Sequence, residues 1–495
     1  MTYSGLISLA VGLITIFTGM IFTLIVTRQL SEKEFGTWNI IGSLMGYVMF
    51  ETIFSYWIVR ETARGSYTAK TGIISSGIFS VVAIIAYLLI IFLVNDQSDA
   101  DTNALYFATI LIPIIFINKT LVGINLGSKP HALGYGVIAF EIVKIPIALI
   151  FVYYFQLGVE GAIIASFVAY LASTGILYYY AKEKIRGSLK KEYLKKWLRL
   201  SWLPLYKDLP NIFFLSDVVI FSLITGSVVG IAHITVARTI SNTIAQTASF
   251  SKAVYPKLVA GGKDEFFQEN LIRYFFFALP FFSMSITFAK PGLWVLNPVY
   301  EIMAPVVVIM SIRTFLTTLS KICYTSIQGK EEVDSVQNST FKDYVKSKLF
   351  LVPTLRFIQY GVYVGLLVII LILFVNPETP LLESVSYWAW ISLIVEIPFF
   401  IFYISLVNKN FKIKIDYISL VKYAIASLIA FIPVYFLMEE FLEYQTSIFE
   451  FLPDLILYLI LATLGYLGVT YLIDSRTRKL FKSVLGEFRY RRTSS

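Results

Sequence analysis

The chain reads Ala-Lys-Glu-Lys-Ile-Arg-Gly-Ser-Leu-Lys-Lys-Glu-Tyr-Leu-Lys-Lys-Trp-Leu-Arg from Ala181 to Arg199, between two long apolar segments. Eight of these nineteen residues are Lys or Arg. Loops this rich in cations stay on the cytoplasmic side of a membrane protein. This basic segment therefore fixes the expected orientation of the chain and divides it into two halves.

The composition indicates a membrane protein rather than a soluble one. The 495 residues are 57% hydrophobic and only 15% charged, with a mean hydropathy of +0.74, whereas soluble domains carry about 25% charged residues. One cysteine, Cys323, excludes an internal disulfide and a cysteine metal cluster. The two histidines, His131 and His233, are far apart in sequence, and we expect neither a metal site nor a cofactor.

The hydropathy pattern predicts an all-α polytopic membrane protein with about fourteen transmembrane helices. A spanning helix needs about 20 mainly apolar residues. The predicted spans are Leu6–Val26, Thr37–Val59, Thr71–Val94, Ala104–Leu126, Tyr135–Phe155, Gly161–Tyr180, Leu200–Ile224, Gly230–Phe250, Leu271–Ala289, Met303–Cys323, Phe357–Val375, Tyr387–Val407, Ile418–Met438 and Leu455–Ile473. No basic residue precedes the first apolar run, so we interpret that run as a retained helix and not as a cleaved signal.

The distribution of basic residues supports this topology. With the N-terminus in the cytoplasm, thirty-one of the 41 Lys and Arg residues fall in inside segments. Three fall outside, and seven lie within spans. We therefore predict a multi-pass protein of the cell membrane with both termini cytoplasmic. The formal charge of +9 is then an orientation signal that also meets anionic lipid headgroups, and no nucleic-acid partner is expected.

The same topology predicts two six-helix lobes followed by two C-terminal helices. The expected parts are an N-terminal lobe at 1–180, the cytoplasmic basic linker at 181–199, a C-terminal lobe at 200–375 and 376–410, and two further helices with a basic tail at 411–495. No loop exceeds about 35 residues in this reading. The chain has no room for a soluble catalytic domain, and we expect it not to be an enzyme.

Charged residues inside spans are the main candidates for function. A charge costs about 2.5–3.5 kcal/mol at the centre of a spanning helix, so such residues face protein or water. Arg238 and Asn242 belong to a polar stripe on the eighth span that also contains Thr235, Gln246 and Ser249. The predicted substrate-binding residues are Arg238, Arg313, Lys321, Lys119, Lys144 and Asn242. Their positive charge suits an anion better than an organic cation.

Each candidate also has a purely structural interpretation. Polar stripes often form hydrogen-bonded seams between helices. Glu141 and Lys144 are three residues apart and can form an ion pair on one helix face. Glu51 is either a proton or cation site or a salt-bridge partner. Glu51 and Asp217 are the candidate coupling residues, and Glu396 is a further carboxylate within a span.

Three short motifs resemble a known family. The first span runs into Val26-Thr27-Arg28-Gln29-Leu30-Ser31-Glu32-Lys33-Glu34-Phe35-Gly36-Thr37-Trp38. This is similar to the start of polysaccharide-biosynthesis flippases, although Thr27 stands where a small residue is usual. Gly230-Ile231-Ala232 followed by Ala237, and Gln328-Gly329-Lys330, are similar to the corresponding places in the second half.

The resemblance is to O-antigen flippase-like, Wzx-type members of the multidrug/oligosaccharidyl-lipid/polysaccharide exporter superfamily. It implies two six-helix lobes and alternating access through a central cavity. It also implies movement of a polyprenyl-(pyro)phosphate-linked oligosaccharide from the cytoplasmic to the outer leaflet, for surface polysaccharide or glycoprotein synthesis. The implied partners are the lipid-linked glycan and the bilayer, with a glycan polymerase or glycosyltransferases as further candidates.

Two other functions remain open at this point. A multidrug or organic-cation antiporter of the same superfamily needs a cavity dominated by carboxylates, which Glu51, Asp217 and Glu396 could supply. An integral membrane glycosyltransferase or ligase needs acidic catalytic residues on a large outer loop. The outer segment Glu439–Asp454 is acidic but short.

The predicted topology can be tested by cysteine labelling. A cysteine introduced within Asp96–Asp101 should react with a membrane-impermeant thiol reagent added to intact cells, because that segment is expected outside. A cysteine within Ser188–Glu192 should react only after the cells are opened. The native Cys323 should be replaced by Ser in both variants as a control. The opposite labelling pattern would reverse the orientation.

Overall fold

The computed structural model describes residues 15, 18–95, 97–251, 264–331, 333, 341–411, 416–479 and 482. These residues are helical or in short connections, and the chain is an all-α polytopic membrane protein. Ten of the described helices are long and apolar enough to cross a membrane. The number rises to eleven if Asp264–Thr287 and Ala289–Leu296, which meet at 69°, form one span. Most of the predicted first span, Leu6–Val26, lies outside the described residues.

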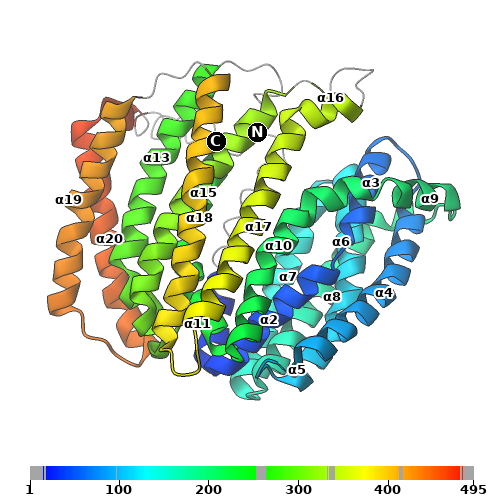
Figure 1. Cartoon of the computed structure of the whole chain (residues 1–495), viewed down its shortest axis with the longest axis horizontal. Coiled ribbons are helices and arrows are strands. Elements are labelled where there is room, and N and C mark those ends of the chain that lie inside the picture. Colours follow the sequence, from blue (N-terminus) through cyan, green and yellow to red (C-terminus); the bar gives the residue numbers. More distant parts are fainter. Residues whose placement is uncertain are drawn as a thin grey trace, which may run out of the picture. The chain divides into compact units, whose positions relative to one another are not determined.

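The described chain forms two compact units (Figure 1). Unit 1 comprises 1–233 and 360–384, and unit 2 comprises 234–359 and 385–495. The boundaries between the two units fall within α11, α17 and α18 and not at the basic segment. These units are defined by compactness, whereas the predicted lobes were defined by six helices each. The two-lobe organisation therefore stays a prediction.

Unit 1 is a bundle built mainly from the N-terminal half. Its helices are α2 (Glu32–Val48), α3 (Thr52–Ala63), α4 (Ala69–Asn95), α5 (Thr102–Phe107), α6 (Leu111–Ser128), α7 (His131–Ala148), α8 (Gly158–Ile185), α9 (Lys191–Arg199) and α10 (Trp202–Thr225). It also contains the start of α11 (Val229–Ser241), the second half of α17 (Lys348–Phe374) and the first residues of α18 (Leu381–Asn410). A short 3₁₀ turn precedes α6, and a π-helical turn at Leu149–Tyr154 extends α7.

Unit 2 holds the remaining helices. They are the rest of α11, η3 (Ile244–Ser251), α13 (Asp264–Thr287), α14 (Ala289–Leu296), η4 (Pro298–Met303), α15 (Ala304–Gly329), α16 (Phe341–Lys346), the first part of α17, most of α18, α19 (Tyr417–Phe441) and α20 (Ile448–Ile473). Phe276 of α13, Tyr423 of α19 and Tyr466 of α20 share one buried apolar cluster. This cluster joins the C-terminal helix pair to α13.

The segment that resembles flippases has a clear structural role at the start of α2. Ser31 caps the helix, because its hydroxyl accepts the Glu34 N–H while the Glu34 carboxylate accepts the Ser31 N–H. Gly36 is buried against the Val228 carbonyl oxygen, which the Cβ of any larger residue would meet. The segment therefore starts a helix and permits a close approach to the turn before α11.

Two predicted spans are broken helices. Thr37–Val59 divides into α2 and α3, with Met49 ending one helix and Glu51 preceding the other. The predicted span Gly230–Phe250 is continuous α-helix only to Ser241 and continues as the 3₁₀ segment η3. Hydroxyls of Ser241, Thr243 and Thr247 donate to backbone carbonyls three residues earlier. Such bonds compete with the helix and often bend it.

The basic segment is also more ordered than a linker. Residues 181–185 complete α8, and Lys191–Arg199 form α9. Trp197 of α9 is fully buried in the core of unit 1, where its ring contacts Phe54 at 6.5 Å between centroids. Lys196 pairs with Glu61 of α3 at 2.7 Å, and Thr71 accepts the Lys190 N–H. The second part of the segment, α9, is an amphipathic helix docked on the bundle.

Replacing the buried indole should release α9. Trp197→Ala removes a fully buried side chain, and such changes cost about 3–5 kcal/mol. We expect limited trypsin digestion of inside-out vesicles to cleave the variant at Lys190 or Lys191 much faster than the parent protein. Leu198→Ala, whose side chain is exposed, is the matched control and should be cleaved at the parental rate. Equal rates for all three proteins would contradict the docking.

Candidate functional site

A cavity of about 300 Å³ in unit 1 contains two of the predicted functional residues. Glu51 and Lys119 line it together with Asp208 of α10 and Tyr56 of α3. Glu51 is 6% exposed and lies at the break between α2 and α3, whereas Lys119 is exposed on α6. Lys119 and Asp208 both act electrostatically on Glu51. The cavity thus combines two carboxyl groups with one ammonium group, so its walls are not purely cationic.

The cavity shows how a broken helix can present a polar residue. Glu51 occupies the N-cap position of α3, and its backbone carbonyl accepts the N–H groups of Phe54 and Ser55. Gly123 on α6 is close to the Ser55 backbone, so α3 and α6 approach tightly beside the cavity. Asp208 was not among the candidates from the sequence, and its place in this cavity was not predicted.

Lys144 lies in a different environment from Lys119. Its ammonium group is 2.8 Å from the Glu141 carboxylate, and both side chains are at least nine-tenths buried. The rings of Phe22 and Phe140 lie 4.9 and 5.0 Å from the same ammonium group. The ion pair expected from the spacing of Glu141 and Lys144 therefore forms. The pair keeps the lysine charge inside unit 1, and Lys144 is not among the residues that line the 300 Å³ cavity.

Asp217 is held by a hydrogen bond from another helix. Its side chain on α10 is almost fully buried, and the Tyr363 hydroxyl of α17 donates to it at 2.8 Å. Tyr363 is separated from Asp217 by 146 residues, and periodicity within one helix gives no signal for such a pair. Asp217 remains a candidate coupling residue, with Tyr363 as a partner that the sequence did not reveal.

Unit 2 contains a buried polar cluster around Glu396 of α18. Glu396 is 3% exposed and accepts hydrogen bonds from the Ser320 hydroxyl at 2.9 Å and the Gln359 amide at 2.8 Å. Arg313 of α15 interacts with it electrostatically. The cluster joins α15, α17 and α18. It explains how Arg313 can be accommodated in an apolar bundle.

Arg238 has an aromatic neighbour in the same unit. Its guanidinium carbon lies 5.0 Å from the centroid of the Trp388 ring on α18. The Ser241 and Thr314 hydroxyls, 3.4 Å apart, connect α11 to α15. A ring face supports a guanidinium and leaves its positive charge in place.

The remaining predicted residues of unit 2 are exposed. Asn242 follows the end of α11, and its N–H donates to the Arg238 carbonyl at 2.8 Å. Lys321 is exposed on α15. The predicted stripe through Gln246 and Ser249 is wrong as a single helical face, because η3 has a different number of residues per turn from α11.

The predicted substrate-binding set is therefore divided between the two units. Lys119 and Lys144 belong to unit 1, and Arg238, Asn242, Arg313 and Lys321 belong to unit 2. Within the described residues, no group of three or more His, Cys, Asp or Glu side chains has an arrangement suited to a metal ion.

Comparisons with known proteins identify the fold. No family model and no curated protein sequence matches the chain. Among solved structures, the lipid II flippase MurJ in an inward closed conformation is similar over 96% of this chain and 100% of its own, at 13% identity and a TM-score of 0.65. An inward-facing multidrug resistance MATE family transporter of the MOP superfamily is similar over 79% of this chain and 94% of its own, at 16% identity and a TM-score of 0.56. The chain has the fold of these membrane transporters.

The Glu396 cluster can be tested by a double-mutant cycle. Arg313→Ala leaves a buried carboxylate without a cation that acts on it electrostatically, and removing a partner of a buried polar group costs about 1–3 kcal/mol. Glu396→Gln in the same chain should recover most of that loss, because the neutral amide still accepts a hydrogen bond. The measurement is the free energy of unfolding in detergent. Lys290→Ala, which breaks a partly exposed pair with Glu301, is the control and should cost less than about 1 kcal/mol.

Strictly additive losses for Arg313→Ala and Glu396→Gln would show that the two side chains do not depend on each other. The presence of a cation at Arg313 would then need an explanation that does not involve Glu396.

Proposed function

We propose that the protein is a flippase that moves a polyprenyl-(pyro)phosphate-linked oligosaccharide from the cytoplasmic to the outer leaflet by alternating access. The observation that carries the proposal is the likeness to the lipid II flippase MurJ over 96% of this chain and the whole of that one. The MATE transporter covers less of the chain, 79%. The flippase motifs of Arg28–Gly36 support the same assignment from the sequence.

In this mechanism the interior cations bind the phosphate of the substrate. Arg238, supported by Trp388, can offer a guanidinium to phosphate oxygens, and Lys321 adds an exposed ammonium group. Lys144 and Arg313 have carboxylates among their neighbours, so their proposed contribution to substrate binding is smaller. Polar side chains such as Asn242 would bind sugar hydroxyls, while the polyprenyl chain stays in the bilayer.

The proposed orientation, with both termini cytoplasmic, gives transport its direction. A glycan polymerase and glycosyltransferases are the proposed partners, because they would supply or consume the lipid-linked glycan. No step of this proposal requires a catalytic residue. The chemistry is recognition of phosphate and sugar, followed by a change in which side of the membrane is accessible.

A second candidate function rests on the 300 Å³ cavity of unit 1. Its two carboxyl groups, Glu51 and Asp208, outnumber its single cation, Lys119. A site of that charge suits an organic cation or a coupling ion. The multidrug antiporter is therefore the alternative, and in the flippase Glu51 would be a proposed coupling residue.

Reconstituted vesicles distinguish the two functions. A fluorescent short-chain polyprenyl-pyrophosphate glycan is placed in both leaflets, and the fraction accessible to an impermeant quencher is followed with time. We expect Arg238→Ala to slow flipping by about tenfold or more, because a charge-assisted hydrogen bond contributes about 1.5–3 kcal/mol. Arg238→Lys should keep part of the activity, since a point charge still attracts phosphate but lacks the guanidinium fork.

The matched control is Lys129→Ala, which removes a surface cation paired with Glu183 and should flip at the parental rate. If the parent protein does not flip the glycan-lipid but takes up organic cations, and if this uptake depends on Glu51, the antiporter is favoured. Full flipping by Arg238→Ala would remove Arg238 from the substrate site.

A further inference from the structure

A cavity lies at the ends of three helices of unit 2. It has a volume of about 660 Å³ and is formed by the first half of α13, the start of α19 and the residues that follow α20. The chain enters α13 and α19 and leaves α20 at this place, so the cavity is at the edge of their apolar segments. That edge is where lipid headgroups meet a membrane protein.

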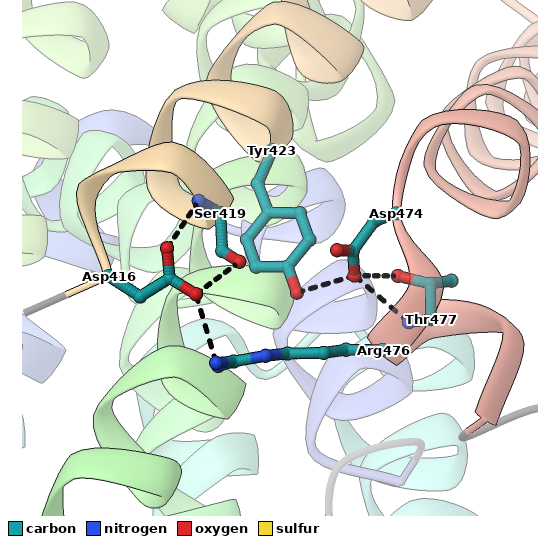
Figure 2. A network of polar contacts seen from close by, with 6 residues as sticks. All are labelled: Asp416, Ser419, Tyr423, Asp474, Arg476 and Thr477. Carbon is teal, nitrogen blue, oxygen red and sulfur yellow. Dashed lines mark hydrogen bonds and ion pairs between the residues drawn. The ribbon is translucent and has the colours of Figure 1, made fainter.

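A hydrogen-bonded network gives one wall of the cavity a defined shape (Figure 2). Asp474 accepts the Tyr423 hydroxyl at 3.0 Å, the Thr477 N–H at 2.9 Å and the Thr477 hydroxyl at 3.0 Å. These contacts fix the turn after α20. The turn carries Arg476, Thr477 and Lys479 to the cavity.

The arginine of this turn is positioned from the other helix. Asp416 accepts the Ser419 N–H at 3.2 Å and the Ser419 hydroxyl at 2.9 Å, and it pairs with Arg476 at 2.9 Å. The backbone N–H and then the hydroxyl of Ser419 hold the pKa of Asp416 below its usual value. Arg476 therefore crosses beneath Tyr423 in a held orientation (Figure 2).

The cavity carries charges of both signs. Arg476 and Lys479 come from the turn after α20, whereas Glu265 and Glu269 come from successive turns of α13. Arg273, one turn further along α13, is 3.7 Å from Glu269, and both are well exposed. An anion alone would meet the two glutamates, and a cation alone would meet the three basic groups. A ligand with both charges can satisfy both.

Below the charged groups the cavity is apolar. Ile272, Phe276 and Phe277 line it, and the Phe276 ring contacts the Tyr423 ring at 5.3 Å between centroids. Its volume is within the range of about 300–1,000 Å³ that small-molecule sites occupy. A molecule with a zwitterionic headgroup and an apolar part next to it matches this arrangement of charged and apolar side chains.

We propose that this cavity binds the headgroup of a bilayer phospholipid with a phosphate and a primary ammonium group, phosphatidylethanolamine. Arg476 and Lys479 bind the phosphate, Glu265 and Glu269 accept hydrogen bonds from the ammonium group, and the glycerol end lies on Ile272 and Phe276. The lipid joins α13 to the α19–α20 pair. It is a resident lipid and not the transported glycan-lipid, so this inference goes beyond the proposed function.

Lipid retention by the purified full-length protein tests the site. The protein is equilibrated in nanodiscs with equal parts of phosphatidylethanolamine, phosphatidylcholine and phosphatidylglycerol, extracted in mild detergent, and the retained lipid is counted by mass spectrometry. We expect phosphatidylethanolamine to be retained over the other two. The methylated choline cannot donate hydrogen bonds to the glutamates, and the glycerol headgroup lacks a cation.

Variants separate the two halves of the site. Lys479→Gln and Arg476→Gln should each lower retained phosphatidylethanolamine about fivefold, since one basic residue near the surface contributes about 1 kcal/mol. Glu265→Gln combined with Glu269→Gln should remove the preference for ethanolamine over choline. Arg478→Gln is the matched control, because this arginine does not line the cavity.

Lys479 is not part of the Asp416–Asp474 network, so Lys479→Gln carries the test if Arg476→Gln does not fold. Equal retention of the three lipids, or full retention by Lys479→Gln, would overturn the proposal. Displacement of the bound lipid by polyprenyl phosphate would also overturn it and assign the cavity to the substrate. None of these readouts depends on transport, so the site can fail while the proposed flippase activity stands.

Discussion

The cost of placing a charge in an apolar helix bundle governs the interior of this protein. An unpaired charge at the centre of a spanning helix costs several times the thermal energy, so interior charges are kept only with partners or water. Lys144 is paired with Glu141. Glu396 accepts two hydrogen bonds and interacts electrostatically with Arg313. The Glu141–Lys144 pair lies on one helix, whereas the contacts of Glu396 bring α15, α17 and α18 together within unit 2.

The same constraint explains how far the sequence could predict the structure. Apolar length predicts a helix from local composition alone, and the long helices α4, α8 and α18 correspond to predicted spans. The Glu141–Lys144 pair was predictable because both residues are on one helix. Partners on other helices were not. Tyr363 is 146 residues from Asp217, and nothing in the local pattern of either helix identifies the other.

Hydropathy also misses where a span breaks. It sums side-chain transfer energies and takes no account of side-chain hydrogen bonds to backbone carbonyls, such as those of Ser241 and Thr243 where α11 ends. The break between α2 and α3 leaves Glu51 at a helix start beside a cavity. Interrupted helices in transporters commonly provide polar contacts at membrane depth. The two broken spans thus lie next to Glu51 and Arg238, both candidates chosen for their charge.

The partners of the interior cations also lower the net positive charge inside the protein. Seven cations within predicted spans suggest a strongly positive interior when they are counted alone. Glu141 beside Lys144, Glu396 near Arg313, and Glu51 with Asp208 around Lys119 reduce that positive charge. Binding of a phosphate therefore depends less on the number of cations than on the neighbours of each cation. The Trp388 ring adds no negative charge beside Arg238, whereas Glu396 offsets part of the positive charge of Arg313. The same reasoning weakens the case for an organic cation at Glu396, whose carboxylate already has Arg313 among its neighbours.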